Sequence, residues 1–118
     1  MYHTNATNKS GGRRMKKLTK KANEMTLREL ASDIDYSVLK PEFTEEQIVE
    51  LTKDGVKLGC ATICINPGYM DLCEPYVKGS DTMLCPVCDF PFGTSSTESK
   101  VKQIEIVAKY DTVKEVDI

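Results

Sequence analysis

The sequence contains no tryptophan, a single histidine and no long apolar run. The histidine, His3, lies near the N-terminus, so a zinc site in the rest of the chain needs four of the five cysteines. No segment approaches the roughly 18 apolar residues that a membrane span requires. The first residues also lack the apolar stretch of a secretory signal. We therefore expect a cytoplasmic protein that does not bind a membrane.

Cysteine, in contrast, is frequent, with five residues at positions 60, 64, 73, 85 and 88. An odd number of cysteines without a sign of secretion argues against a disulfide framework. Residues 85–88, CPVC, form a C-x-x-C spacing, which a redox pair or half of a zinc site also uses. Their neighbours Leu84 and Val87 favour a buried strand instead, in which cysteine acts as a small apolar residue. We therefore predict no metal and no cofactor.

Charge is distributed unevenly along the chain. Residues 1–26 hold seven basic side chains and one acidic side chain, whereas residues 27–118 hold nine basic and seventeen acidic ones. The first segment is also poor in apolar residues, so it cannot offset its ordering entropy. We predict a basic disordered tail over 1–26 and a folded domain over 27–118. The tail could contact nucleic acid by charge alone, but the folded part offers no basic face and we do not expect a nucleic-acid partner.

Helical and strand patterns alternate through the rest of the chain. Thr44 and Gln47, and likewise Ser95 and Glu98, have the spacing of a capping box at a helix start. The apolar patterns predict helices over 26–32, 44–58, 69–77 and 96–109, and strands over 34–39, 61–65, 82–88 and 115–118. This order predicts a four-stranded parallel sheet with helical crossovers. The hydroxyl-rich residues 94–97 then cap a helix and line the carboxyl edge of the sheet, where such folds place ligand sites.

Four motifs resemble those of the deoxyribose-phosphate aldolase family. Residues 34–41, IDYSVLKP, are similar to I-D-x-T-x-L-K-P, and residues 64–69, CINPGY, to C-V-N-P-x-Y. Residues 90–101, FPFGTSSTESKV, are similar to F-P-x-G-x-x-x-T-E-x-K-V, and residues 115–117, EVD, to E-I-D. The motifs come in the family's order with matching intervals. The resemblance covers about residues 34–118.

The resemblance implies a fold and a reaction. The fold class would be a partial TIM (β/α)8 barrel, with the first four parallel strands and their intervening helices. The family reversibly cleaves 2-deoxy-D-ribose 5-phosphate to D-glyceraldehyde 3-phosphate and acetaldehyde. It uses a lysine Schiff base, whose iminium withdraws electrons from the bond that breaks, and it uses no metal. The partner implied for this chain is a phosphorylated deoxy sugar.

The resemblance also implies site residues. Asp117 matches an aspartate that moves protons, although a carboxylate there could simply end the strand. Asp35 and Ser37 match polar residues at the end of the first strand, and Asp35 could instead cap a turn. Cys64 matches a cysteine close to the site, with packing as the simpler role. Tyr36 and Asp89 depart from the family pattern, which has histidine and glycine there.

The matched region does not include the positions of the Schiff-base lysine or the phosphate site, which fall after Ile118 in the family. A complete barrel of this kind needs roughly 200 residues or more. We therefore expect the 118 residues by themselves to have no aldolase turnover. The alternatives are part of a longer aldolase, a chain that pairs with itself or with a separate C-terminal half-barrel, and a non-catalytic remnant with a binding role.

Overall fold

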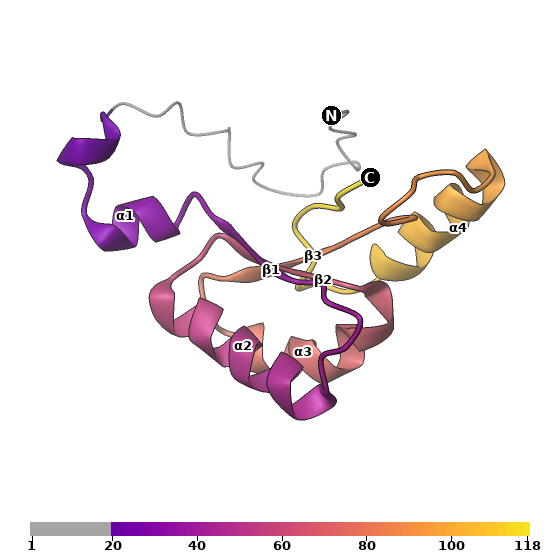
Figure 1. Ribbon diagram of the computed structural model, residues 1–118, viewed down its shortest axis with the longest axis horizontal. Coiled ribbons are helices and arrows are strands. Elements are labelled where there is room, and N and C mark those ends of the chain that lie inside the picture. Colours follow the sequence, from indigo (N-terminus) through magenta and orange to yellow (C-terminus); the bar gives the residue numbers. More distant parts are fainter. Residues whose placement is uncertain (1–19) are drawn as a thin grey trace.

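A three-stranded parallel sheet organises the computed structural model, which describes residues 20–118 (Figure 1). Strands β1 (Asp35–Val38), β2 (Thr62–Ile65) and β3 (Met83–Pro86) follow one another in that order across the sheet. Residues 1–19 lie outside the described part, so disorder of the tail and its contact with nucleic acid stay predictions. Within the described end of the predicted tail, residues Ala22–Glu24 form one turn of 3-10 helix.

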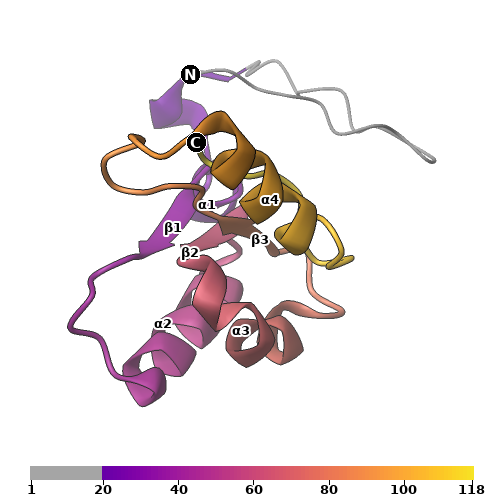
Figure 2. The same ribbon diagram turned by 90° about the vertical axis from the view of Figure 1, so that its right-hand side faces the viewer.

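Four α-helices accompany the strands in residues 20–118. They are α1 (Leu27–Ala31), α2 (Glu45–Leu58), α3 (Met70–Val77) and α4 (Thr97–Val107), and a 3-10 turn (Pro67–Tyr69) precedes α3. Helices α2 and α3 lie side by side against one face of the sheet (Figures 1 and 2). None of the helices described over residues 20–118 is long and apolar enough to cross a membrane.

The start and end of α2 follow from local chemistry. The Thr44 N–H donates to Gln47 Oε1 at 2.9 Å, and the Gln47 N–H donates to Thr44 Oγ1 at 3.3 Å. These two bonds form the capping box that the sequence predicts. The helix ends where Gly59 takes a left-handed conformation with φ of 80°, which glycine adopts without steric cost.

The main core lies between the sheet and the helices. Ile63, Ile65 and Leu84 are fully buried on the strands, and Ile48 and Met70 face them from α2 and α3. Burial of one such side chain stabilises the fold by about 1.5–3 kcal/mol. The continuous apolar run at residues 61–65 therefore contains strand β2, as the sequence predicts, and side chains on both faces of this strand are buried.

The predicted fourth strand is wrong. Residues 112–117 run beside β3, but only two isolated parallel bridges form, Leu84 with Val113 and Val87 with Asp117. Leu84 and Val87, the residue after β3, are three positions apart, whereas Val113 and Asp117 are four positions apart. The extra residue is a bulge, which interrupts a continuous ladder. The described residues thus contain a three-stranded parallel sheet with helices, consistent with part of an α/β barrel.

The predicted capping box at Ser95 is also wrong, by one residue. Helix α4 begins after Ser96, whose Oγ accepts a 3.2 Å hydrogen bond from the Ser99 N–H. The preceding Ser95 is held outside the helix because its N–H donates to Asp89 Oδ2 at 2.8 Å. Its own hydroxyl is buried and has no hydrogen-bond partner within residues 20–118.

Candidate functional site

The second face of the sheet carries a separate small cluster. Cys64, Cys85 and Val87 are buried there, and Leu39 packs against them. All four residues come from the strands or the segments that follow them, and no helix of residues 20–118 contributes to this cluster. The views in Figures 1 and 2 place α2 and α3 on the opposite face. We call this second face, with its cluster, the open face.

Strand register places the predicted site residues on the open face. Ser37, Cys64 and Cys85 are partners in one row across β1, β2 and β3. Side chains alternate between the two faces of a strand, so residues two positions away share the face of this row. Asp35 lies two residues before Ser37. Asp117 bridges Val87, which lies two residues after Cys85. The four predicted residues therefore share one face.

Asp35 occupies a different place from the one predicted. It is the first residue of β1 and not its end, and it pairs with Thr62, the first residue of β2. The Thr62 hydroxyl donates to Asp35 Oδ1 at 2.7 Å. Asp35 and Asp117 thus lie on opposite sides of the Ser37–Cys64–Cys85 row, each about 7 Å from it along the strands. The sequence did not indicate Thr62, which lies in an otherwise apolar run.

Carboxylates surround the central thiols. The pKa of Cys64 is lowered because the Cys85 thiol hydrogen-bonds to it, while burial and the charges of Asp117, Asp35 and Glu115 act in the opposite direction. The pKa of Cys85 is raised by the same hydrogen bond, by burial and by nearby negative charge. Glu115 belongs to the EVD motif, but no feature of the sequence distinguishes it as a site residue. The negative charges of Asp117, Asp35 and Glu115 thus all oppose ionisation of Cys64 in this buried cysteine pair.

The loop after β3 borders the open face and is held by polar contacts. Asp89 has a left-handed backbone with φ of 56°, which explains why a glycine suits this position. The pKa of Asp89 is lowered, first by the hydrogen bond from the Ser95 N–H. Lys100 Nζ donates to the Gly93 carbonyl at 2.8 Å and lies 3.7 Å from Asp89 Oδ2. The hydroxyl-rich segment thus shapes this loop through Ser95 and caps α4 through Ser96.

No trio of histidine, cysteine or carboxylate side chains in residues 20–118 is arranged to hold a metal ion. Asp35, Asp117 and Glu115 lie around the cysteine pair without converging on one point. What the open face offers chemically is a set of carboxylates for proton transfer, together with a hydroxyl at Ser37 and two thiols.

Comparisons with known proteins give the family. No family model matches the sequence. The chain is 45% identical over 76 positions to a deoxyribose-phosphate aldolase of Clostridium kluyveri. The aligned part covers 64% of this chain and 35% of the relative. A deoxyribose-phosphate aldolase of Listeria innocua is 35% identical over 89 positions, covering 75% of this chain and 40% of the relative. The chain belongs to the deoxyribose-phosphate aldolase family, to whose N-terminal part it corresponds.

Solved structures of aldolases agree with this assignment. The tetrameric deoxyribose-phosphate aldolase of Aeropyrum pernix superposes with a TM-score of 0.69 at 26% identity, over 77% of this chain and 38% of that one. The aldolase QR15 superposes with a TM-score of 0.67 at 31% identity, over 75% of this chain and 38% of that one. The chain spans little more than a third of the length of the curated aldolases it matches.

Proposed function

We propose that this chain supplies the N-terminal part of an aldolase site that reversibly cleaves 2-deoxy-D-ribose 5-phosphate. The products are D-glyceraldehyde 3-phosphate and acetaldehyde, and the reaction passes through a Schiff base with a lysine. The proposal rests on family membership and on one geometric observation. The bridge between Val87 and Asp117 puts the Asp117 carboxylate on the face that carries Ser37 and Cys64. A cytoplasmic location remains the expectation from the sequence.

The proposed roles follow from the side chains on the open face. Asp117 moves a proton to or from the carbon that loses its bond partner, since a carboxylate is both a proton acceptor and, once protonated, a donor. Asp35 and Ser37 bind polar groups of the sugar. Cys64, the register partner of Ser37 on β2, shapes the surface that the substrate contacts. Ser37 and Cys64 belong to the shared row, Asp35 lies two positions before Ser37, and Asp117 bridges Val87, two positions after Cys85.

Residues 1–118 by themselves are proposed to have no turnover. None of their lysines matches the place of the family's Schiff-base lysine. Lys100 lies on α4, and its ammonium group is engaged with the Gly93 carbonyl and with Asp89 in the loop after β3. Incubation of the purified chain with 2-deoxyribose 5-phosphate and borohydride is expected to give neither cleavage nor a trapped lysine adduct. Either product would contradict this part of the proposal.

A chimaera tests the reaction itself. Residues 20–118 would be joined to the remaining C-terminal part of the Clostridium kluyveri relative, and sugar cleavage would be followed by aldehyde release. We expect cleavage, and we expect Asp117→Asn to reduce kcat roughly 10²–10⁴-fold, which is the usual contribution of a proton-transfer group. Asp111→Asn is the matched control, because Asp111 is an exposed residue in the turn after α4. The control should keep full activity.

Two results of this experiment would count against the proposal. If the folded chimaera released no aldehyde, the proposal that this chain contributes to sugar cleavage would be wrong. If the Asp117→Asn and Asp111→Asn chimaeras were equally active, the assigned reaction would stand. The proposed proton transfer by Asp117 would then be wrong. Circular dichroism of each variant shows whether the protein is folded.

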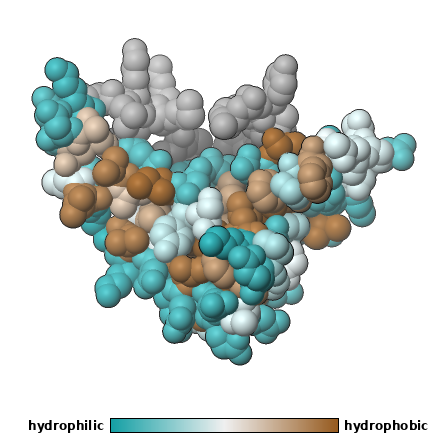
Figure 3. Space-filling view, in the orientation of Figure 1, coloured by the Kyte–Doolittle hydropathy of each residue, from teal (hydrophilic) through white to brown (hydrophobic). Residues whose placement is uncertain are grey.

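A second proposed function, self-association, rests on exposed apolar side chains. Leu27 is 87% exposed, and Leu30 and Ile34 are also exposed; Figure 3 shows apolar surface over α1 and the start of β1. Contiguous exposed apolar surface and open strand edges favour association. Light scattering after size-exclusion chromatography is expected to show more than one copy of the 118-residue chain per particle. A monomer at micromolar concentration would contradict this proposal.

A further inference from the structure

Two cysteines face each other across β2 and β3. Cys64 and Cys85 are register partners in the parallel ladder, and they are only 4% and 3% exposed. Neighbouring strands lie about 4.7–4.9 Å apart, which falls inside the range of roughly 4.4–6.8 Å between the Cα atoms of disulfide-bonded cysteines. The backbone therefore already meets the Cα requirement of a disulfide at this pair. All five cysteines of the chain are free thiols in this structure.

The other three cysteines are placed differently. Cys88 lies three residues after Cys85 and turns toward α4, where its thiol contacts the Lys100 carbonyl oxygen at 3.6 Å. Cys73 belongs to the core on the helix side and accepts from the Thr52 hydroxyl at 3.4 Å. Cys60 lies four residues before Cys64, about 13 Å away along an extended chain. The C-x-x-C spacing of residues 85–88 therefore does not form the pair, and the register partner of Cys85 does.

We propose that Cys64 and Cys85 form a redox-modification site at which a hydroperoxide produces a reversible disulfide between β2 and β3. Both thiols lie on the open face, so no helix of residues 20–118 covers them. Their low exposure favours a small oxidant such as hydrogen peroxide over a bulky disulfide. The pairing is set by strand register and is independent of any sugar chemistry. Oxidation would remove the Cys64 thiol from the row that it shares with Ser37.

The reaction balances with one peroxide and two thiols. The Cys64 thiolate attacks one peroxide oxygen, the O–O bond breaks, and the departing hydroxide takes a proton to leave as water. Cys85 then loses its proton, and its sulfur attacks the Cys64 sulfenic acid. The S–O bond breaks and a second water leaves, so the two thiols lose two electrons to the peroxide. Cys64 is the expected nucleophile because the hydrogen bond from Cys85 lowers its pKa.

The test uses the reduced 118-residue chain and hydrogen peroxide. Free thiols are counted after alkylation, and tryptic peptides are mapped by mass spectrometry before and after treatment with dithiothreitol. Cleavage after Lys57, Lys78 and Lys100 puts Cys64 with Cys60 and Cys73 on one peptide, and Cys85 with Cys88 on the next. Fragmentation of the linked peptides then assigns the bond. We expect thiols to fall from five to three, with a bond between Cys64 and Cys85 that dithiothreitol reverses.

Single variants make the assignment specific. Cys64→Ser and Cys85→Ser are expected to abolish the link within one chain, whereas Cys88→Ser is expected to keep it. Cys88 is the matched control because it is equally buried and lies on the same tryptic peptide as Cys85. A bond that involves Cys60, Cys73 or Cys88 would overturn the proposal, as would five unreacted thiols. The unsubstituted chain alone decides this point if a serine variant fails to fold. None of these readouts depends on aldolase activity.

Discussion

The Thr62 hydroxyl donates a 2.7 Å hydrogen bond to Asp35 Oδ1 across the first strand pair. Thr62 is fully buried, whereas Asp35 is exposed at the start of β1. The buried Thr62 side chain therefore holds the Asp35 carboxylate in place on the open face. This contact joins residues 27 positions apart in the chain and adds a side-chain bond to the backbone pairing of β1 and β2.

Removal of this bond should weaken the β1–β2 pair. We expect Thr62→Val, which keeps the shape of the side chain, to lower the free energy of unfolding by about 1 kcal/mol, the usual net value of a hydrogen bond. Urea unfolding measures the change. In an Asp35→Ala background the same substitution should cost less, because the partner is already gone. An equal cost in both backgrounds would show that the bond contributes nothing to stability.

The contact of Gly55 with Ile63 predicts an unusual effect in α2. Replacing glycine by alanine inside a helix normally gains about 0.8–1 kcal/mol. A Cβ at Gly55 would clash with Ile63 Cδ1 and lie 3.2 Å from the Tyr36 ring. Since overpacking a core costs roughly 1–3 kcal/mol, we expect Gly55→Ala to lower the free energy of unfolding. Thermal and urea unfolding provide the measurement.

The control for this prediction removes the clashing atom. Ile63→Val deletes Cδ1, so Gly55→Ala should cost less in the Ile63→Val background than in the original chain. A stabilising effect of Gly55→Ala alone would mean that Ile63 moves aside at no cost, and the prediction would be wrong.

Two neighbouring serines should respond differently to alanine at the start of α4. Ser96 caps the helix, and Ser96→Ala is expected to lower the free energy of unfolding by about 1 kcal/mol. Ser95 holds Asp89 through its backbone N–H, which alanine keeps, so Ser95→Ala is expected to cost less than Ser96→Ala. Urea unfolding of the two variants tests the one-residue shift of the cap. If Ser95→Ala lowered the free energy of unfolding more than Ser96→Ala, the result would support the cap at Ser95 that the sequence predicted.

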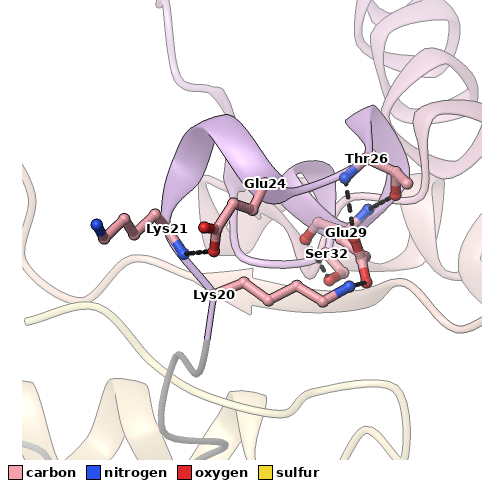
Figure 4. A network of polar contacts seen from close by, with 6 residues as sticks. All are labelled: Lys20, Lys21, Glu24, Thr26, Glu29 and Ser32. Carbon is pink, nitrogen blue, oxygen red and sulfur yellow. Dashed lines mark hydrogen bonds and ion pairs between the residues drawn. The ribbon is translucent and has the colours of Figure 1, made fainter.

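The carboxylate of Glu29 should titrate at unusually low pH. Lys20 Nζ lies 2.6 Å from Glu29 Oε1, and the Thr26 N–H donates to Glu29 Oε2 at 2.8 Å (Figure 4). The hydrogen bond from Lys20, followed by that from Thr26, lowers the pKa of Glu29 from 4.5 to about 2. Because the folded pKa is the lower one, this contribution to stability is complete above pH 4.5. It is lost as the pH falls through about 2.

Nuclear magnetic resonance of the Glu29 side chain checks this value directly. We expect a titration midpoint near 2 in the original chain and a higher midpoint in Lys20→Met, which removes the largest cause of the shift. Lys21→Met is the control, because the Lys21 contact with Glu24 uses its backbone N–H and not its ammonium group. A midpoint near 4.5 in the original chain would contradict the contacts in Figure 4.

The sequence by itself determined the order of the four helices and the first three strands, the capping box at Thr44 and Gln47, and the family. Such signals are local, because a cap joins residues three positions apart and an apolar stripe repeats every turn. Only the tertiary structure decided the bulge between Val113 and Asp117, the cap at Ser96 and the register that pairs Cys64 with Cys85. These features depend on contacts between distant segments, whose relative positions are set by packing of the whole sheet and leave no periodic signal in any one segment.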